Sequence, residues 1–176
     1  DLPQEAKVCL EGLDDCLANR GDADARWQRH LSKDRQARIA LRLGRPRAAL
    51  ALYRRTRDEA MSEQGAAERD AGVRELAGLL YVAAWLEPDG PDEAAEWQSW
   101  SIEALANIEI CRSRGETIGY GNFDQMYLLR ACALWGWRRG DTASLDMVMA
   151  HRALLRERLF AAGKADPGPP GLCFSY

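Results

Sequence analysis

An apolar pattern with helical spacing is interrupted at three places along the chain, and each time it resumes within a few residues. The first interruption lies at residues 44–46, in the stretch LRLGRPRAALALYRR. Glycine favours the position just past a helix C-terminus, and proline favours the first turn of the next helix. The pattern breaks again at residues 87–94 (EPDGPDEA) and 138–145 (RRGDTASL), where Asp141 can cap the helix that follows. Three successive helical hairpins are therefore predicted.

The spacing of these turns indicates a repeated architecture. Gly44, Gly90 and Gly140 are separated by 46 and 50 residues, which is the range of two-helix repeat units. A further apolar stripe precedes the first hairpin, and no segment shows the alternation of a strand. The predicted fold class is all-α, with about seven helices arranged as successive hairpins and no sheet.

Residues 1–163 are predicted to form a single all-helical domain, and residues 164–176 a Pro/Gly-rich C-terminal tail, since GKADPGPPG cannot be helical. Within the domain, residues 122–139 (NFDQMYLLRACALWGWRR) are apolar almost all round, which predicts a buried central helix. The glycine-rich residues 114–121 before it lack the Lys-Ser/Thr pair of a phosphate-binding loop. A plain connection is expected there.

The stretch GRPRAALALYRR resembles the second helix of a tetratricopeptide repeat. Gly44, Ala49 and Tyr53 fall where that family places its turn glycine, its small packing residue and its aromatic residue. The resemblance implies that the hairpins pack in a tetratricopeptide-like manner. An irregular bundle is the alternative, because any alanine-rich amphipathic hairpin has a similar appearance.

Residues that carry catalysis or bind metals are few. His30 and His151 lie in different parts of the chain, and neither has a ligand-spaced partner. The sequence contains no GxSxG nucleophile motif. A non-enzymatic protein without cofactor or metal site is predicted, and an enzyme with a helical-bundle pocket is the weakest alternative.

The cysteines indicate the cellular compartment. There are five, with no close CxxC pair, which favours reduced and mostly buried thiols in a cytoplasmic protein. Cys9 and Cys16 lie seven apart on one helical face and are assigned to core packing rather than to a metal site. No apolar run approaches the length of a membrane span, and no signal-peptide pattern opens the chain, so no membrane partner is expected.

Charge is strongly segregated along the chain, although the net charge is only −3. Residues 20–57 carry 12 basic and 3 acidic side chains, whereas residues 58–111 carry 2 basic and 13 acidic ones. One interpretation is that the basic face of one hairpin packs against the acidic face of the next. Another is that a basic stripe follows a phosphate backbone, but few aromatic residues accompany it, and nucleic acid is the less favoured partner. The stripe comprises Arg26, Arg29, Arg35, Arg38, Arg42, Arg45 and Arg47.

The third interpretation places a protein-binding surface on the acidic second hairpin, where carboxylates surround two tryptophans. Rigid aromatic anchors in an anionic field suit a basic protein partner. Of the two tryptophans, Trp100 is expected to be the more exposed. The predicted partner-binding residues are Glu87, Asp89, Asp92, Glu93, Glu96, Trp97, Trp100 and Glu103.

A small, acidic, all-helical chain without a catalytic motif resembles the immunity proteins of bacterial toxin systems. The resemblance lies in architecture and composition, and it implies a stoichiometric inhibitor that covers a toxin, such as a basic toxin domain, by charge and shape. The alternative is a tetratricopeptide-like scaffold or secretion chaperone. An immunity protein is expected to use an acidic convex or edge surface, and a scaffold the groove lined by the first helix of each hairpin.

Overall fold

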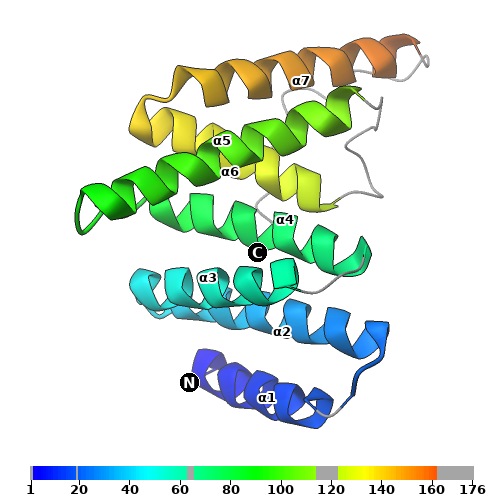
Figure 1. Cartoon of the computed structure of the whole chain (residues 1–176), viewed down its shortest axis with the longest axis vertical. Coiled ribbons are helices and arrows are strands. Elements are labelled where there is room, and N and C mark those ends of the chain that lie inside the picture. Colours follow the sequence, from blue (N-terminus) through cyan, green and yellow to red (C-terminus); the bar gives the residue numbers. More distant parts are fainter. Residues whose placement is uncertain (1, 19, 63–65, 114–122, 162–176) are drawn as a thin grey trace.

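The computed structural model describes residues 2–18, 20–62, 66–113 and 123–161. Within these ranges the chain forms helices and turns, without a strand, so the all-α prediction is confirmed (Figure 1). The predicted tail and the connection at residues 114–121 lie outside the described residues. The helices are α1 (Leu2–Leu17), α2 (Ala23–Arg42), α3 (Pro46–Ser62), α4 (Ala66–Ala83), α5 (Pro91–Ser113), α6 (Phe123–Arg139) and α7 (Thr142–Ala161).

The three predicted turns join α2 to α3, α4 to α5 and α6 to α7. Gly44 and Gly140 both have a φ of 70°, in the left-handed region that glycine adopts without strain. Gly90 has a different role, because its carbonyl accepts a hydrogen bond from the Ala94 N–H at the start of α5. Since α4 already ends at Ala83, the second turn is longer than the other two.

Along the longest axis of the molecule α1 to α4 follow one another, α5 and α6 cross beyond α4, and α7 lies at the end opposite α1 (Figure 1). The first helix of each hairpin packs against the first helix of the next, so α4 lies between α2 and α6. The second helix of each hairpin also packs against the first helix of the next, α3 on α4 and α5 on α6. Two surfaces result, one formed by the first helices and one by the second helices.

The core lies around α4, which packs against α2, α3, α5 and α6. Leu76, Leu79 and Leu80 of this helix are fully buried. Tyr53 of α3 packs so closely on α4 that a methyl group at Gly78 would lie 2.5 Å from the tyrosine ring. The central helix is therefore α4, and the prediction that residues 122–139 form it is wrong.

The misassigned helix α6 has one buried side and one exposed side. Leu128, Cys132 and Trp135 are buried, but Arg130 and Trp137 are exposed. Its aromatic residues made it look apolar all round, although arginines accompany them on the exposed side.

Two further predictions concern single residues. Asp141 does cap α7, because its carboxylate accepts hydrogen bonds from the N–H and hydroxyl of Ser144 and from the hydroxyl of Ser101. Of the three cysteines whose side chains the structure describes, Cys132 is buried as predicted, whereas Cys9 and Cys16 of α1 are free thiols exposed to solvent. These two do not belong to the core, because α1 lies at one end of the molecule and, among the described helices, packs only against α2.

Candidate functional site

The predicted acidic site lies at the start of α5 and in the turn before it, beside α3. Arg47 of α3 donates to both oxygens of Glu93, at 2.9 and 2.7 Å, and to Asp89 at 2.8 Å. Arg54, two turns further along α3, donates to Glu93 at 2.9 Å and to Glu96 at 2.5 Å. The acidic side chains of one hairpin thus neutralise the basic side chains of the preceding one.

The series continues along both helices, because Arg57 pairs with Glu103. We call these residues the α3–α5 ladder: Arg47, Arg54, Arg57, Asp89, Glu93, Glu96 and Glu103. The interpretation that a basic face packs against an acidic face is confirmed. A network with shared partners holds its side chains better than isolated surface pairs, which contribute little.

Glu93 is the centre of the ladder. Burial raises the pKa of its carboxyl, but hydrogen bonds from Arg47, from the Asp89 N–H and from Arg54 outweigh that effect and lower the pKa from 4.5 to about 2. The Glu93 carboxylate therefore stays charged over the physiological range. Its hydrogen-bonding capacity is used within the chain, which leaves little of it to recognise a partner.

The two tryptophans of the predicted site are core residues. Trp97 is 1% exposed and Trp100 is 4% exposed. Trp100 is therefore the more exposed of the two, as predicted, but both are buried and neither is an anchor on the surface. Arginine guanidinium groups cover the indole rings, with Arg47 5.7 Å from the Trp97 ring centroid and Arg54 5.3 Å from that of Trp100. The ladder therefore shields both indoles from water.

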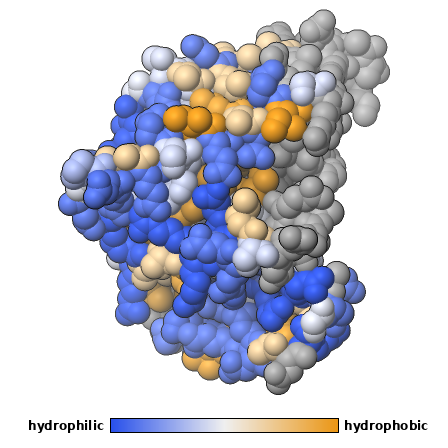
Figure 2. Space-filling view, viewed as in Figure 1, coloured by the Kyte–Doolittle hydropathy of each residue, from blue (hydrophilic) through white to orange (hydrophobic). Residues whose placement is uncertain are grey.

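Three predicted site residues keep an exposed carboxylate, all at the turn between α4 and α5: Glu87, Asp89 and Asp92. Glu87 approaches Arg139 at 3.5 Å, and Asp89 pairs with Arg47. In Figure 2 hydrophilic residues cover most of the visible surface, and hydrophobic residues gather in its upper part, at the height of α5 and α7 in Figure 1.

The first helices, on which a scaffold is expected to hold its partner, present a second candidate surface. Residues at helical spacing on α2, α4 and α6 remain partly or fully exposed and share one side of each helix. We call this surface the first-helix face. It comprises Arg35, Arg38 and Arg42 of α2, Arg74, Tyr81 and Trp85 on and just after α4, and Tyr127, Arg130, Leu134, Trp137 and Arg138 of α6.

One cluster ties the first-helix face together. The Arg38 guanidinium lies 5.0 Å from the ring centroid of Tyr127 and 3.0 Å from Asp34, whose carboxylate also accepts from the Tyr53 hydroxyl at 3.1 Å. Burial lowers the pKa of Arg38, but the neighbouring Asp34 carboxylate raises it. The net effect is a raised pKa, so the guanidinium stays charged. Burial raises the pKa of Tyr53, and Asp34 adds to the effect, so the phenol remains protonated as a donor. A side chain of α2 thus contacts α6 across α4.

Further arginine–aromatic contacts join neighbouring first helices. Arg74 of α4 lies 4.9 Å from the ring centroid of Trp27 on α2. Arg138 of α6 lies 4.1 Å from the Trp85 centroid and 5.6 Å from the Trp137 centroid. Trp85 is 51% exposed and Trp137 is 68% exposed. Cations stacked on exposed indoles are held in place while their N–H edges remain accessible.

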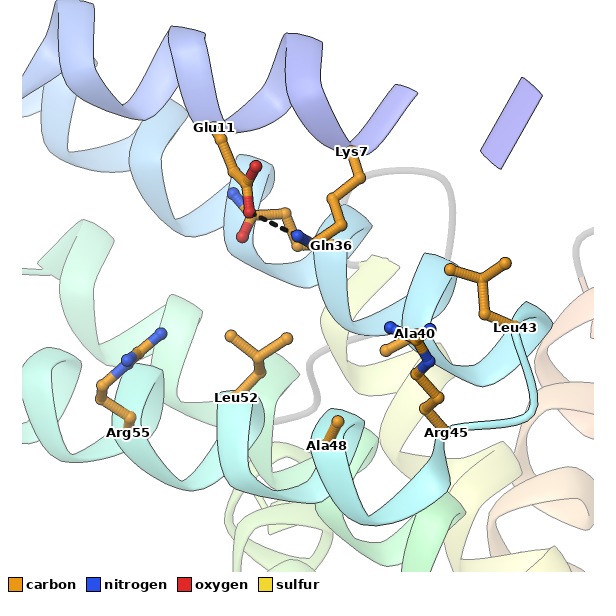
Figure 3. A pocket seen from close by; sticks show the side chains of 9 residues that line it. All are labelled: Lys7, Glu11, Gln36, Ala40, Leu43, Arg45, Ala48, Leu52 and Arg55. Carbon is orange, nitrogen blue, oxygen red and sulfur yellow. Dashed lines mark ion pairs between the residues drawn. The ribbon is translucent and has the colours of Figure 1, made fainter. Parts of the chain in front are cut away.

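A small cavity lies between α1, α2 and α3, away from both surfaces (Figure 3). Its volume of about 200 Å³ is below the range typical of small-molecule sites. Leu43 and Leu52 line it, and the Lys7–Glu11 ion pair of α1 stands at its edge. Its lining combines aliphatic carbons with solvated charges, which gives no set of groups for catalysis.

Within the described ranges, no three His, Cys, Asp or Glu side chains come together in a way that could hold a metal ion. No helix in that part of the chain is long and apolar enough to cross a membrane. Comparison with known proteins finds no family model, no curated protein and no solved structure that matches the chain.

Proposed function

We propose that the chain is a non-catalytic protein-binding module that holds a segment of a partner protein against its first-helix face. The observation that carries this proposal is the pair of exposed tryptophans, Trp85 just after α4 and Trp137 on α6, which both lie near the Arg138 guanidinium. Exposed tryptophan next to arginine is the composition of binding hot spots. The proposal corresponds to the tetratricopeptide-like scaffold that the sequence suggested as the alternative.

The scaffold is favoured over an acidic binding face because the ladder already uses most of the acidic side chains. A partner that engaged Glu93 or Glu96 would have to displace Arg47 or Arg54. Arg35, Arg42, Arg130 and Arg138 of the first-helix face have no carboxylate partner among the described residues, so a partner that binds them displaces none. The stack of hairpins supplies a rigid support for them.

A peptide-display selection on the intact chain, with a library of unbiased composition, tests this proposal. Enriched peptides are expected to bind wild-type protein saturably and to bind the Trp137→Ala variant at least about tenfold more weakly, as for a hot-spot residue. The matched control is Ile102→Ala, since Ile102 is 61% exposed on α5 and lies outside the first-helix face. Peptides that bind both variants equally, or a selection that enriches none, would contradict the proposal.

A second candidate function is inhibition of a bacterial toxin by an immunity protein. The exposed carboxylates of Glu87, Asp89 and Asp92 favour it, because they form an acidic edge at the α4–α5 turn. The test is co-expression with the product of a neighbouring toxin-like gene. The variant Glu87→Lys with Asp92→Lys is expected to slow association in a salt-dependent manner. Variants at Glu93 or Glu96 are unsuitable, because they would also break the ladder.

A further inference from the structure

We infer that the segment bound by the first-helix face is acidic, and that Arg138, held between Trp85 and Trp137, receives one of its carboxylates. This inference rests on the proposed function and adds the chemical class of the partner. It depends on which arginines of the chain already have an acidic partner and which do not.

The arginines on the two surfaces differ in this respect. On α3, the ladder arginines are all paired with carboxylates of α5. On the first-helix face, four arginines make no ion pair or hydrogen bond with any residue that the structure describes. They are Arg35 and Arg42 of α2 and Arg130 and Arg138 of α6.

Carboxylates near these arginines are few and already bonded. Asp34 is buried and bonds to Arg38 and Tyr53. Glu75 of α4 is fully buried, and it has an interaction partner of its own. The described part of the first-helix face therefore carries an excess of positive charge, and an acidic segment is the complementary occupant.

The surroundings of Arg138 suit a carboxylate. Its guanidinium lies within cation–π distance of two indoles, which restricts the side chain and lowers the entropy lost on binding. A guanidinium presents paired N–H groups that match the two oxygens of a carboxylate. The exposed indoles on either side provide apolar area for a side chain next to that carboxylate in the partner.

Nucleic acid would satisfy the arginines as well, but two features favour a protein segment. Trp85 is followed closely in the chain by the exposed Glu87 and Asp89. These carboxylates would repel the continuous charge of a phosphate backbone, whereas a protein segment can place uncharged residues beside them. The net charge of −3 opposes the long-range attraction on which backbone-phosphate binding depends.

The test uses fluorescence anisotropy with the intact chain and three labelled probes. The first is a synthetic peptide of alternating glutamate and leucine with one central tryptophan, the second replaces each glutamate by glutamine, and the third is oligothymidylate. We expect the glutamate peptide to bind at least about tenfold more tightly than the glutamine peptide. Its affinity is expected to fall as salt is raised.

Three variants locate the contact. Arg138→Gln is expected to weaken binding of the glutamate peptide about tenfold, and Arg138→Lys to recover it only in part, because lysine lacks the paired N–H groups. The matched control is Arg55→Gln, which removes an exposed charge of α3 away from the first-helix face and is expected to change affinity by less than about twofold. Melting curves confirm that each variant is folded.

Each contrary outcome identifies what failed. Equal binding of the glutamine peptide, or equal effects of Arg138→Gln and Arg55→Gln, would overturn the acidic partner. The protein-binding proposal would survive that result if display-selected peptides still depended on Trp137. Tighter binding of oligothymidylate than of the glutamate peptide would assign the surface to nucleic acid. Absence of binding by the glutamate peptide overturns this inference, and absence of any selected peptide overturns the proposed function as well.

Discussion

Replacing Glu93 by glutamine removes the central charge of the α3–α5 ladder and keeps the size of the side chain. The pKa of Glu93 falls from 4.5 to about 2, a shift that corresponds to about 3 kcal/mol between the two protonation states. Arg47 and Arg54 are partly exposed, so solvent screening reduces the net contribution to about 1–2 kcal/mol. For a chain of this length the melting temperature is expected to drop by about 3–6 °C at pH 7.

The pH dependence gives the sharper test. A carboxyl whose pKa is lowered by folding stabilises the native state above its unfolded pKa, and that contribution is lost as pH falls through the folded pKa. The melting temperatures of wild-type and Glu93→Gln protein should therefore differ most above pH ~5 and converge toward pH ~2. The assay is thermal unfolding followed by circular dichroism across this range.

The matched control is Asp92→Asn, which removes the same charge one residue earlier on α5. Asp92 is exposed and lies outside the ladder, so its replacement should change stability by no more than about 0.5 kcal/mol. Equal shifts for the two variants would refute the reasoning. So would a difference between wild-type and Glu93→Gln protein that stays constant with pH.

Three further predictions concern packing, capping and thiol reactivity. Gly78→Ala should destabilise the protein by about 1–3 kcal/mol, because the added methyl group meets the Tyr53 ring. Gly12→Ala, in open space on α1, should stabilise it by about 0.5–1 kcal/mol. Urea unfolding measures both changes. Asp141→Ala should cost about 2 kcal/mol in the same assay, since α7 loses its cap and buried hydroxyls lose their acceptor. Cys9, which is exposed, should react with iodoacetamide in native protein. Cys132 should not react, because it is buried and burial raises the pKa of its thiol to about 12. Mass spectrometry of the labelled peptides measures this, and modification of Cys132 before Cys9 would contradict it.

Local signals were enough to predict the helices and all three turns. At Gly44 and Gly140 the backbone needs a left-handed conformation that glycine provides, so a single residue marks the helix end. The turn between α4 and α5 was found through Pro91. Its glycine, Gly90, helps to start α5 rather than to end α4. Such signals act over a few residues, and no long-range information is needed to interpret them.

The burial of individual side chains could not be predicted in the same way. Helical spacing indicates that Trp97 and Trp100 share a side of α5, but it does not show how wide the buried side is. The width depends on what packs around α5, and here α4, α6 and α7 pack against it while α3 arginines cover its tryptophans. Both indoles are therefore buried, and the predicted binding site becomes part of the core.

The sequence indicated that a scaffold would use the first helix of each hairpin, but it did not predict which residues form the first-helix face, because they come from three hairpins. The sequence did contain a signal, since Arg35, Arg38 and Arg42 recur at helical spacing along α2. The missing information was that Trp85 and Trp137, more than fifty residues apart, meet around one arginine. The spacing of charges within one helix is local, whereas the grouping of aromatic residues from two helices depends on how those helices pack.

The segregation of charge along the chain explains why one surface is satisfied and the other is not. The arginines between residues 20 and 57 divide between the two helices of one hairpin, and the two helices face different neighbours. Those of α3 lie beside the acidic start of α5 and form the ladder. Those of α2 lie beside α4, whose described residues on that surface are Arg74, Tyr81 and Trp85 and include no carboxylate. Among the described residues, the acidic side chains of α5 and of the turn before it therefore pair with α3 rather than with the first-helix face. The positive charge left on the first-helix face is available to a partner that brings carboxylates of its own.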